Sequence, residues 1–214
     1  MTHTVRESID WAVRAWTLSR TFPVERMHPR VVARMNAAPS GARWHVAFSG
    51  GADSLTLLLL LWAHWPERRG GLVALHFDHR LRGAESDADV AFCREVCGAL
   101  DIRLEVGTAD WSREPDGISE ADARDARMAF FKEAMSEVGV ALLFLGHQKN
   151  DIAETMLMRL ARGSGAGGLA APRPVARHGA ATHLRPLLTL AHAEIVEALR
   201  AAGLEWREDA TNEG

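Results

Sequence analysis

The fold is decided by the stretch from Trp44 to Trp65, which reads WHVAFSGGADSLTLLLLLWAHW. It begins with a short apolar run, Val46 to Phe48, of the kind that forms a buried parallel strand. A polar turn with two glycines follows, and from Leu55 the sequence continues as an almost unbroken apolar helix. This order predicts a phosphate-binding loop, because glycine lets main-chain N–H groups approach an anion and the first helical turn attracts negative charge.

The residues of the turn are Ser49, Gly50, Gly51, Ala52, Asp53 and Ser54. We predict that all six contact phosphate, with the two serines adding hydroxyl donors. Asp53 is the unusual member, because a carboxylate repels phosphate unless a cation such as Mg²⁺ takes oxygens from both. The loop is not a Walker A motif, since no Gly-Lys-Ser/Thr closes it. The alternative is a serine–glycine turn in which the aspartate caps the helix.

The length of 214 residues indicates one medium domain, or one domain with an extension. With 47% apolar and 25% charged residues, the composition is typical of a globular protein. The longest apolar run, Leu55 to Ala63, is too short to cross a bilayer. No secretory leader opens the chain, and we expect a cytoplasmic protein without membrane contact.

Two cysteines, Cys93 and Cys97, stand four residues apart in a helical pattern with Val90 and Leu100. We interpret them as one buried helix face. A redox or zinc role is the alternative, but they do not form Cys-x-x-Cys and zinc would need further ligands.

The formal net charge of -3 argues against a self-sufficient nucleic-acid binder. The charge is unevenly distributed, because no Asp or Glu occurs between Glu154 and Glu194. This acid-free stretch contains Arg159, Arg162, Arg173, Arg177 and Arg185.

We expect residues 1–40 to form an N-terminal helical extension and residues 41–214 to form the main domain. From Trp44 the pattern alternates strand and helix, which predicts an α/β fold: a doubly wound, mostly parallel five-stranded sheet with helices on both faces. The expected strands are 45–48, 72–77, 103–106, 141–145 and 183–187, and the expected helices are 54–65, 87–100, 120–138, 151–162 and 191–202. Ligands of such sheets bind at the carboxyl ends of the strands.

Two groups of polar residues follow expected strands or open helices. His76, Asp78 and His79 suggest metal ligands, but they alternate sides of an extended segment, so we favour a strand end that lines a nucleotide pocket. Arg124 and Arg127 lie on one face of the helix that begins at the capping-box-like Ser119 to Asp122. They either face solvent beside neighbouring acids or point into the crevice to stabilise a phosphate.

After the fourth strand, His147, Asp151 and Glu154 are spaced to lie on one side of a helix start. The spacing fits three interpretations: a face of metal ligands, a carboxylate pair that binds a cation or an amine, or a capped, charged first turn of the helix. The glycines at 163, 165 and 168 spell G-x-G-x-x-G, but a helix precedes them and prolines follow, so they are not a dinucleotide fingerprint. We expect a mobile loop that clamps a substrate.

Together these blocks resemble the tRNA(Ile)-lysidine synthetase family of N-type ATP pyrophosphatases over residues 44–212. The first loop is shared by many ATP pyrophosphatases, whereas the blocks around His147 and residues 162–165 are more particular to this family. The matching blocks are 49–54, 76–82, 120–127, 146–155, 162–169, 185–188 and 206–212.

The resemblance implies that ATP adenylates O2 of the wobble cytidine of tRNA(Ile), and that the amine of free L-lysine then displaces AMP to give lysidine. It implies that Asp53 holds Mg²⁺ on the leaving pyrophosphate and that Arg127 stabilises charge at the α-phosphate. Asp151 and Glu154 would position the lysine and help to remove its proton. The remaining expected ligands are His76 for ATP and, for substrate, His147, Arg124, Arg162, Gly163, Ser164 and Gly165. The arginines of the acid-free stretch would meet RNA phosphate, and the glycine loop would admit the splayed-out base.

The chain departs from the family at Asn150 and Ile152, where the family has aspartate and glutamine. Two alternatives therefore stay open: a related pyrophosphatase that adenylates another base or a small molecule, and a nucleotide-binding module without catalysis. The family also carries tRNA-binding domains after the catalytic one, and we expect this chain to correspond to the catalytic domain alone, with weak, salt-sensitive tRNA binding. We also allow for a homodimer.

Overall fold

The computed structural model describes residues 9–111, 117–136, 141–161 and 172–208, without the side chains of residues 159 and 160. Its centre is a six-stranded sheet with the order β3-β2-β1-β4-β6-β5. All neighbouring strands are parallel except β5 and β6, which form an antiparallel pair. The strands are β1 (Arg43–Ala47), β2 (Leu72–Asp78), β3 (Arg103–Thr108), β4 (Ala141–Phe144), β5 (Val175–His178) and β6 (Ala181–Leu184).

The α/β architecture is confirmed, with one correction: the sheet has six strands, not five. The additional strand β5 is a short edge strand, and its sequence Val-Ala-Arg-His lacks the apolar alternation that marks a half-buried strand. It pairs with β6 through a tight turn at Gly179, whose φ of 58° suits glycine. The strand expected over 183–187 ends at Leu184, before Pro186, which has no main-chain donor for a sheet ladder.

Each expected helix is present. The helices are α1 (Trp11–Thr21), α2 (Pro29–Asn36), α3 (Ala52–His64), α4 (Ala84–Ala99), α5 (Glu120–Ala134), α6 (Lys149–Ala161) and α7 (His192–Ala201), with short 3-10 turns at Val24–Arg26 and Pro66–Gly71. The predicted capping box starts α5: Ser119 Oγ accepts the Asp122 N–H, and the Asp122 carboxylate accepts the Ser119 N–H. None of the described helices is long and apolar enough to span a membrane.

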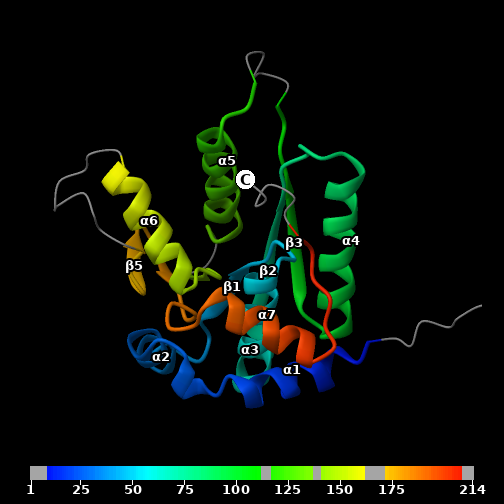
Figure 1. Cartoon of the computed structure of the whole chain (residues 1–214), viewed down its shortest axis with the longest axis vertical. Coiled ribbons are helices and arrows are strands. Elements are labelled where there is room, and N and C mark those ends of the chain that lie inside the picture. Colours follow the sequence, from blue (N-terminus) through cyan, green and yellow to red (C-terminus); the bar gives the residue numbers. More distant parts are fainter. Residues whose placement is uncertain (1–8, 112–116, 137–140, 162–171, 209–214) are drawn as a thin grey trace, which may run out of the picture.

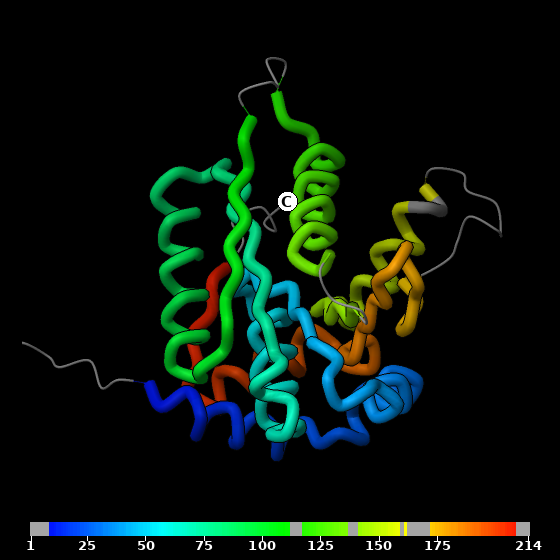
Figure 2. The backbone as a smooth tube through the Cα atoms, turned by 180° about the vertical axis from the view of Figure 1, so that it is seen from behind, coloured from blue at the N-terminus to red at the C-terminus, as the bar shows by residue number. Residues whose placement is uncertain are grey.

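Helices cover both faces of the sheet. Alternate strand residues point to opposite sides, and both sides carry apolar residues that pack against helices. Trp44 and Val46 face the larger core, to which α1, α2, α3, α4 and α7 contribute. Val73 and Leu75 face a smaller core against α5. The predicted buried cysteine face is confirmed, since Cys93 and Cys97 are free thiols with 0% and 1% exposure in the larger core. Figure 1 shows the helices around the sheet, and Figure 2 shows α1 and α2 along one end of the molecule from behind.

The sheet changes winding direction at β1. The chain moves from β1 through β2 to β3 on one side, then returns to β4 on the other side of β1. Residues that follow β1 and β4 therefore meet at the point where doubly wound sheets bind ligands.

Candidate active site

The loop after β1 leaves the start of α3 open to an anion. Gly50 has a φ of 91°, a conformation that side chains disfavour, and it turns the chain from the strand into the helix. Gly51 is the N-cap of α3, and no side chain caps the helix there. The first-turn N–H groups of a helix need a partner outside it. This end of α3 is therefore suited to bind phosphate oxygens.

The two serines of the loop bond to the loop itself. Their hydroxyl oxygens are 3.1 Å apart, and Ser54 Oγ also donates to the Gly51 carbonyl at 3.0 Å. Ser49 Oγ in turn accepts the Gly51 N–H at 3.3 Å. These bonds fix the shape of the loop, a role additional to the predicted contact with phosphate.

Asp53 lies in the first turn of α3, where its carboxylate contacts His192 from the start of α7. His192 Nδ1 is 3.0 Å from Asp53 Oδ1, and the Asp53 side chain keeps 28% of its surface exposed. Burial raises the pKa of the Asp53 carboxyl, the bond from His192 opposes that rise, and the nearby Asp151 adds to it. The carboxylate is thus held in place at the mouth of the loop.

The predicted magnesium ligand fits this position. Asp53 and Asp151 supply hard carboxylate oxygens, which Mg²⁺ prefers, and Asp151 lies close enough for its charge to raise the pKa of Asp53. Among the described residues there is no group of three or more His, Cys, Asp or Glu placed to hold a metal ion. An ion at Asp53 would therefore need phosphate oxygens and water as its other ligands.

The segment after β4 lies directly against the loop. A Cβ atom on Gly146 would be 3.2 Å from Asp53 C and from Ser54 N, so only glycine fits without displacement. The next residue, His147, accepts a hydrogen bond at Nδ1 from Arg185 Nε, at 3.3 Å. Burial, and next the charge of Arg185, lower the pKa of His147 to about 4. At neutral pH the ring is therefore uncharged, with its proton on Nε2.

Arg185 is not at the surface, although it belongs to the acid-free stretch expected to meet RNA. It is only 9% exposed, and its Nη1 donates to the Arg173 carbonyl at 2.8 Å. Its guanidinium is therefore bound to His147 inside the protein. Arg173 and Arg177, from the same stretch, are exposed.

Asp151 and Asn150 organise the starts of α6 and α7. Asp151 Oδ2 accepts the Gln148 N–H at 2.6 Å, the capped-turn arrangement that the spacing left open. Asn150 Oδ1 accepts the His192 N–H at 3.4 Å, which ties α6 to the helix that holds Asp53. Asn150 therefore has a structural partner of its own at the position where the family carries an aspartate.

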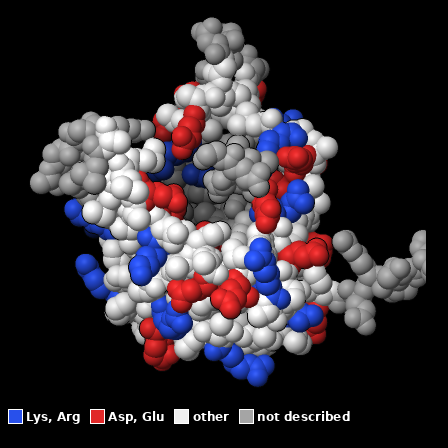
Figure 3. Space-filling model, viewed as in Figure 1, with Lys and Arg blue, Asp and Glu red and all other residues white. Residues whose placement is uncertain are grey.

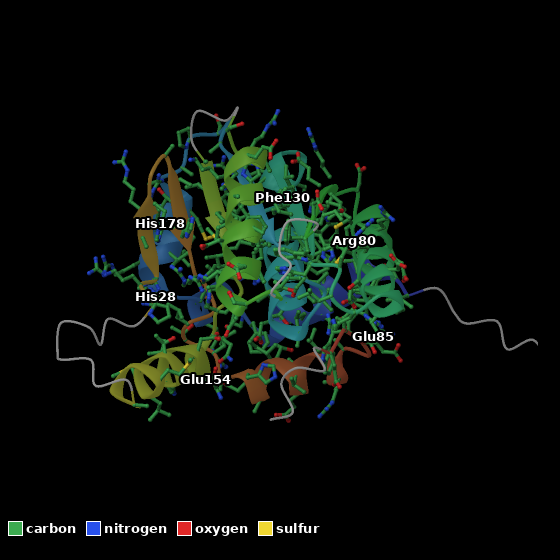
Figure 4. The ribbon with its side chains drawn as sticks, turned by 90° about the horizontal axis from the view of Figure 1, so that it is seen from above. His28, Arg80, Glu85, Phe130, Glu154 and His178 are labelled. Carbon is green, nitrogen blue, oxygen red and sulfur yellow. The ribbon has the colours of Figure 1, made fainter. Side chains whose placement is uncertain are left out.

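The remaining expected site residues with described side chains are Arg124 and Arg127 on α5 and Glu154 on α6. Both arginines are exposed on α5, and their charges reach His147 strongly enough to lower its pKa. Glu154 is exposed on α6. Seen from above, Glu154 on α6 and Glu85 on α4 stand on opposite sides of α7 (Figure 4). Figure 3, which has the same view as Figure 1, shows a hollow on the face towards the reader, with basic side chains inside it and acidic ones around its rim.

His76 lies behind the loop and not in its mouth. It is 4% exposed, and its Nδ1 is 2.9 Å from the Phe48 carbonyl and 3.3 Å from Cys93 Sγ. Its observed contact is thus to the main chain from which the loop starts. Asp78 forms a turn by accepting the Arg80 N–H at 2.8 Å, so His76 and Asp78 have different tasks.

Four expected substrate ligands, Arg162 to Gly165, fall outside the described residues. Sequence reasoning assigned no site role to His192, and it expected Arg185 to meet RNA phosphate and not to contact His147. Arg185 lay inside the strand expected over 183–187 and His192 inside the helix expected over 191–202, so neither was considered among the residues that follow a strand.

A family model described as the PP-loop domain matches residues 24–214. The tRNA(Ile)-lysidine synthase of Solibacter usitatus is 45% identical over 177 residues, and that of Bacillus subtilis is 38% identical over 180 residues. These matches cover 82% and 83% of this chain but 38% of each relative, so the chain spans about two fifths of their length.

Two solved structures share the fold. The U34-tRNA thiolase NcsA from Methanococcus maripaludis, with its [4Fe-4S] cluster, has a TM-score of 0.65 at 16% identity, covering 94% of this chain and 66% of that one. The phosphoadenylyl-sulfate reductase from Candida auris has a TM-score of 0.54 at 10% identity, covering 96% of this chain and 90% of that one.

Proposed function

Because the chain belongs to the PP-loop domain family, we propose that it is the catalytic part of an ATP-dependent ligase that forms lysidine in tRNA(Ile). The observation that carries this proposal is the uncapped start of α3, with Asp53 in its first turn, at the switch point of the sheet. The names of the relatives supply the acceptor and the product.

In the first step, O2 of the cytidine attacks the α-phosphorus of ATP and pyrophosphate leaves. The main-chain N–H groups of Ala52 to Ser54 hold the outer phosphates, and Asp53 would hold a magnesium ion beside them. That ion, when bound, neutralises charge on the pyrophosphate. Arg127 stabilises the charge that develops on the α-phosphate.

In the second step, the lysine amine attacks C2 of the cytidine, and AMP leaves with O2. An amine attacks only when it is neutral, so a group must bind the ammonium and take a proton. Glu154 and Asp151, near the start of α6, supply the carboxylates for both tasks. His147, kept neutral because burial and then the charge of Arg185 lower its pKa, donates from Nε2 to a phosphate or base oxygen.

Transfer of sulfur is a poorer match to this site. Cys93 and Cys97 are buried in the core, and burial raises the pKa of Cys97 to about 12. A thiol without access to solvent or to the thiolate form is inert.

The test is to incubate the chain with ATP, Mg²⁺, lysine and tRNA(Ile) at low salt, then analyse the nucleosides by mass spectrometry. We expect cytidine to be converted to lysidine, and Asp53→Asn to slow conversion by about 10²-fold or more. Pyrophosphate release with a different acceptor, and no modified cytidine, would favour another substrate. A chain that binds ATP but shows no turnover with any acceptor would favour a non-catalytic module.

A further inference from the structure

We propose that Asp89 is a positioning residue: together with Arg82 and Arg207 it forms a clamp that holds the nucleotide-binding loop in its open, phosphate-binding shape. The inference deepens the proposed function and rests on it only for the identity of the ligand. Asp89 lies on α4, and Arg207 lies in the segment after α7, far from the loop in sequence. Figure 1 shows that segment, in red, running between α7 and α4 towards the loop.

The clamp consists of one buried carboxylate and two arginines. Asp89 is 8% exposed, its Oδ1 accepts Arg207 Nε at 2.5 Å, and its Oδ2 accepts Arg82 Nη2 at 2.9 Å. Both carboxylate oxygens are thus bonded to a cation, as a buried charge requires. Charge-assisted bonds of this kind fix geometry more firmly than neutral ones.

Arg207 connects the clamp to the loop in two ways. Its main-chain N–H donates to the Gly50 carbonyl at 3.0 Å. Its side-chain stem also packs on Gly50, because a Cβ there would lie 3.1 Å from Arg207 Cγ and 3.2 Å from Phe92 Cδ1. Gly50 is the residue with a φ of 91° that turns the chain into α3. The position of Arg207 therefore restrains the turn on which the open helix start depends.

Open space lies beside the clamp. A pocket of about 330 Å³ is lined by Arg82, Glu85, Asp89, Trp206, Arg207 and Glu208. On the side of this pocket, the Arg207 side chain consequently has room to swing away if its partner is removed. Without Asp89 the segment after α7 would loosen, and the Gly50 turn would lose its restraint.

The experiment compares Asp89→Asn and Arg207→Ala with the unsubstituted protein and with Glu85→Gln, a control that removes an acid from the same pocket. Hydrogen exchange is measured on the nucleotide-free proteins, and ATP binding is titrated with Mg²⁺ present. We expect residues 49–54 to exchange about tenfold faster in both clamp variants, while α1 exchanges at its normal rate. ATP affinity should fall about tenfold, and Arg207→Lys should recover part of both losses. Glu85→Gln should behave as the unsubstituted protein.

Unchanged exchange in the loop of Arg207→Ala, or an equal increase in the loop and in α1, would overturn the inference. Arg207→Ala decides the matter even if Asp89→Asn does not fold, because the Arg207 side chain is 37% exposed. The exchange measurement needs no ATP, so it tests the clamp independently of the proposed function. Failure of the unsubstituted protein to bind ATP would instead reject the proposed function.

Discussion

Replacing Gly146 with alanine would press the end of β4 against the nucleotide-binding loop. The new Cβ would lie 3.2 Å from Asp53 C and Ser54 N and 3.3 Å from Ser54 Cα. Non-bonded carbon atoms normally approach to about 3.5–4.0 Å, so the distance between the new Cβ and these atoms must increase by several tenths of an ångström. All three neighbours are main-chain atoms of α3 and cannot rotate away. We therefore expect the first turn of α3 to shift.

Inserting a methyl group into a tightly packed place costs about 1–3 kcal/mol. The free protein relieves part of this strain by moving the turn, and ATP binding must restore the original position. We expect the affinity for ATP with Mg²⁺ to fall about tenfold, which corresponds to about 1.4 kcal/mol. The assay is isothermal titration calorimetry on the folded variant, with its thermal midpoint measured in parallel.

The matched control is Gly98→Ala. Gly98 lies on α4 with nothing within 4 Å of a Cβ, and alanine suits a helix better than glycine by about 0.5–1 kcal/mol. This variant should bind ATP normally and be slightly more stable. If folded Gly146→Ala binds ATP as tightly as the unsubstituted protein, the contact between β4 and the loop does not shape the phosphate site, and the reasoning is refuted.

Three further predictions concern the sheet and its histidines. Burial lowers the pKa of His147 and His183 to about 4, so the unfolded chain binds more protons between about pH 6.5 and pH 4. The free energy of unfolding should therefore decrease as the pH falls from about 6.5 to about 4, by roughly 3 kcal/mol per histidine at most. A free energy of unfolding in urea that does not change with pH over this range would contradict the prediction. Arg185→Gln should raise the pKa of His147, measured by NMR titration, and an unchanged value would disprove the assigned contact. Gly107→Ala should lower the thermal midpoint by several degrees, because its Cβ would lie 2.6 Å from the Phe130 ring; an unaltered midpoint would show that the ring moves freely.

The strongest local patterns predicted the fold well. The apolar run before Ser49 and the continuous apolar helix after it placed β1 and α3, because both are buried over most of their length. The resemblance to the ATP pyrophosphatases is confirmed at the level of the PP-loop domain, whose family model matches residues 24–214. The edge strand β5 was missed because its residues carry no alternation, and its pairing depends on the partner strand β6.

The site was only partly predictable. Residues that immediately follow strands, such as Asp53 and His147, could be expected at one edge of the sheet. The contacts of His192 with Asp53 and of Arg207 with Gly50 depend on how the chain returns after β6, which no local spacing encodes. His76 was expected at the nucleotide, and the observed contact to the Phe48 carbonyl is a tertiary contact between β2 and the end of β1.

The most direct test of the account is the magnesium dependence of ATP binding to the unsubstituted protein and to Asp53→Asn, measured by calorimetry. If Asp53 anchors a cation on phosphates held by α3, the unsubstituted protein should bind ATP much more tightly with Mg²⁺ than with EDTA, and Asp53→Asn should lose that difference. Equal magnesium dependence in both proteins would contradict the central claim.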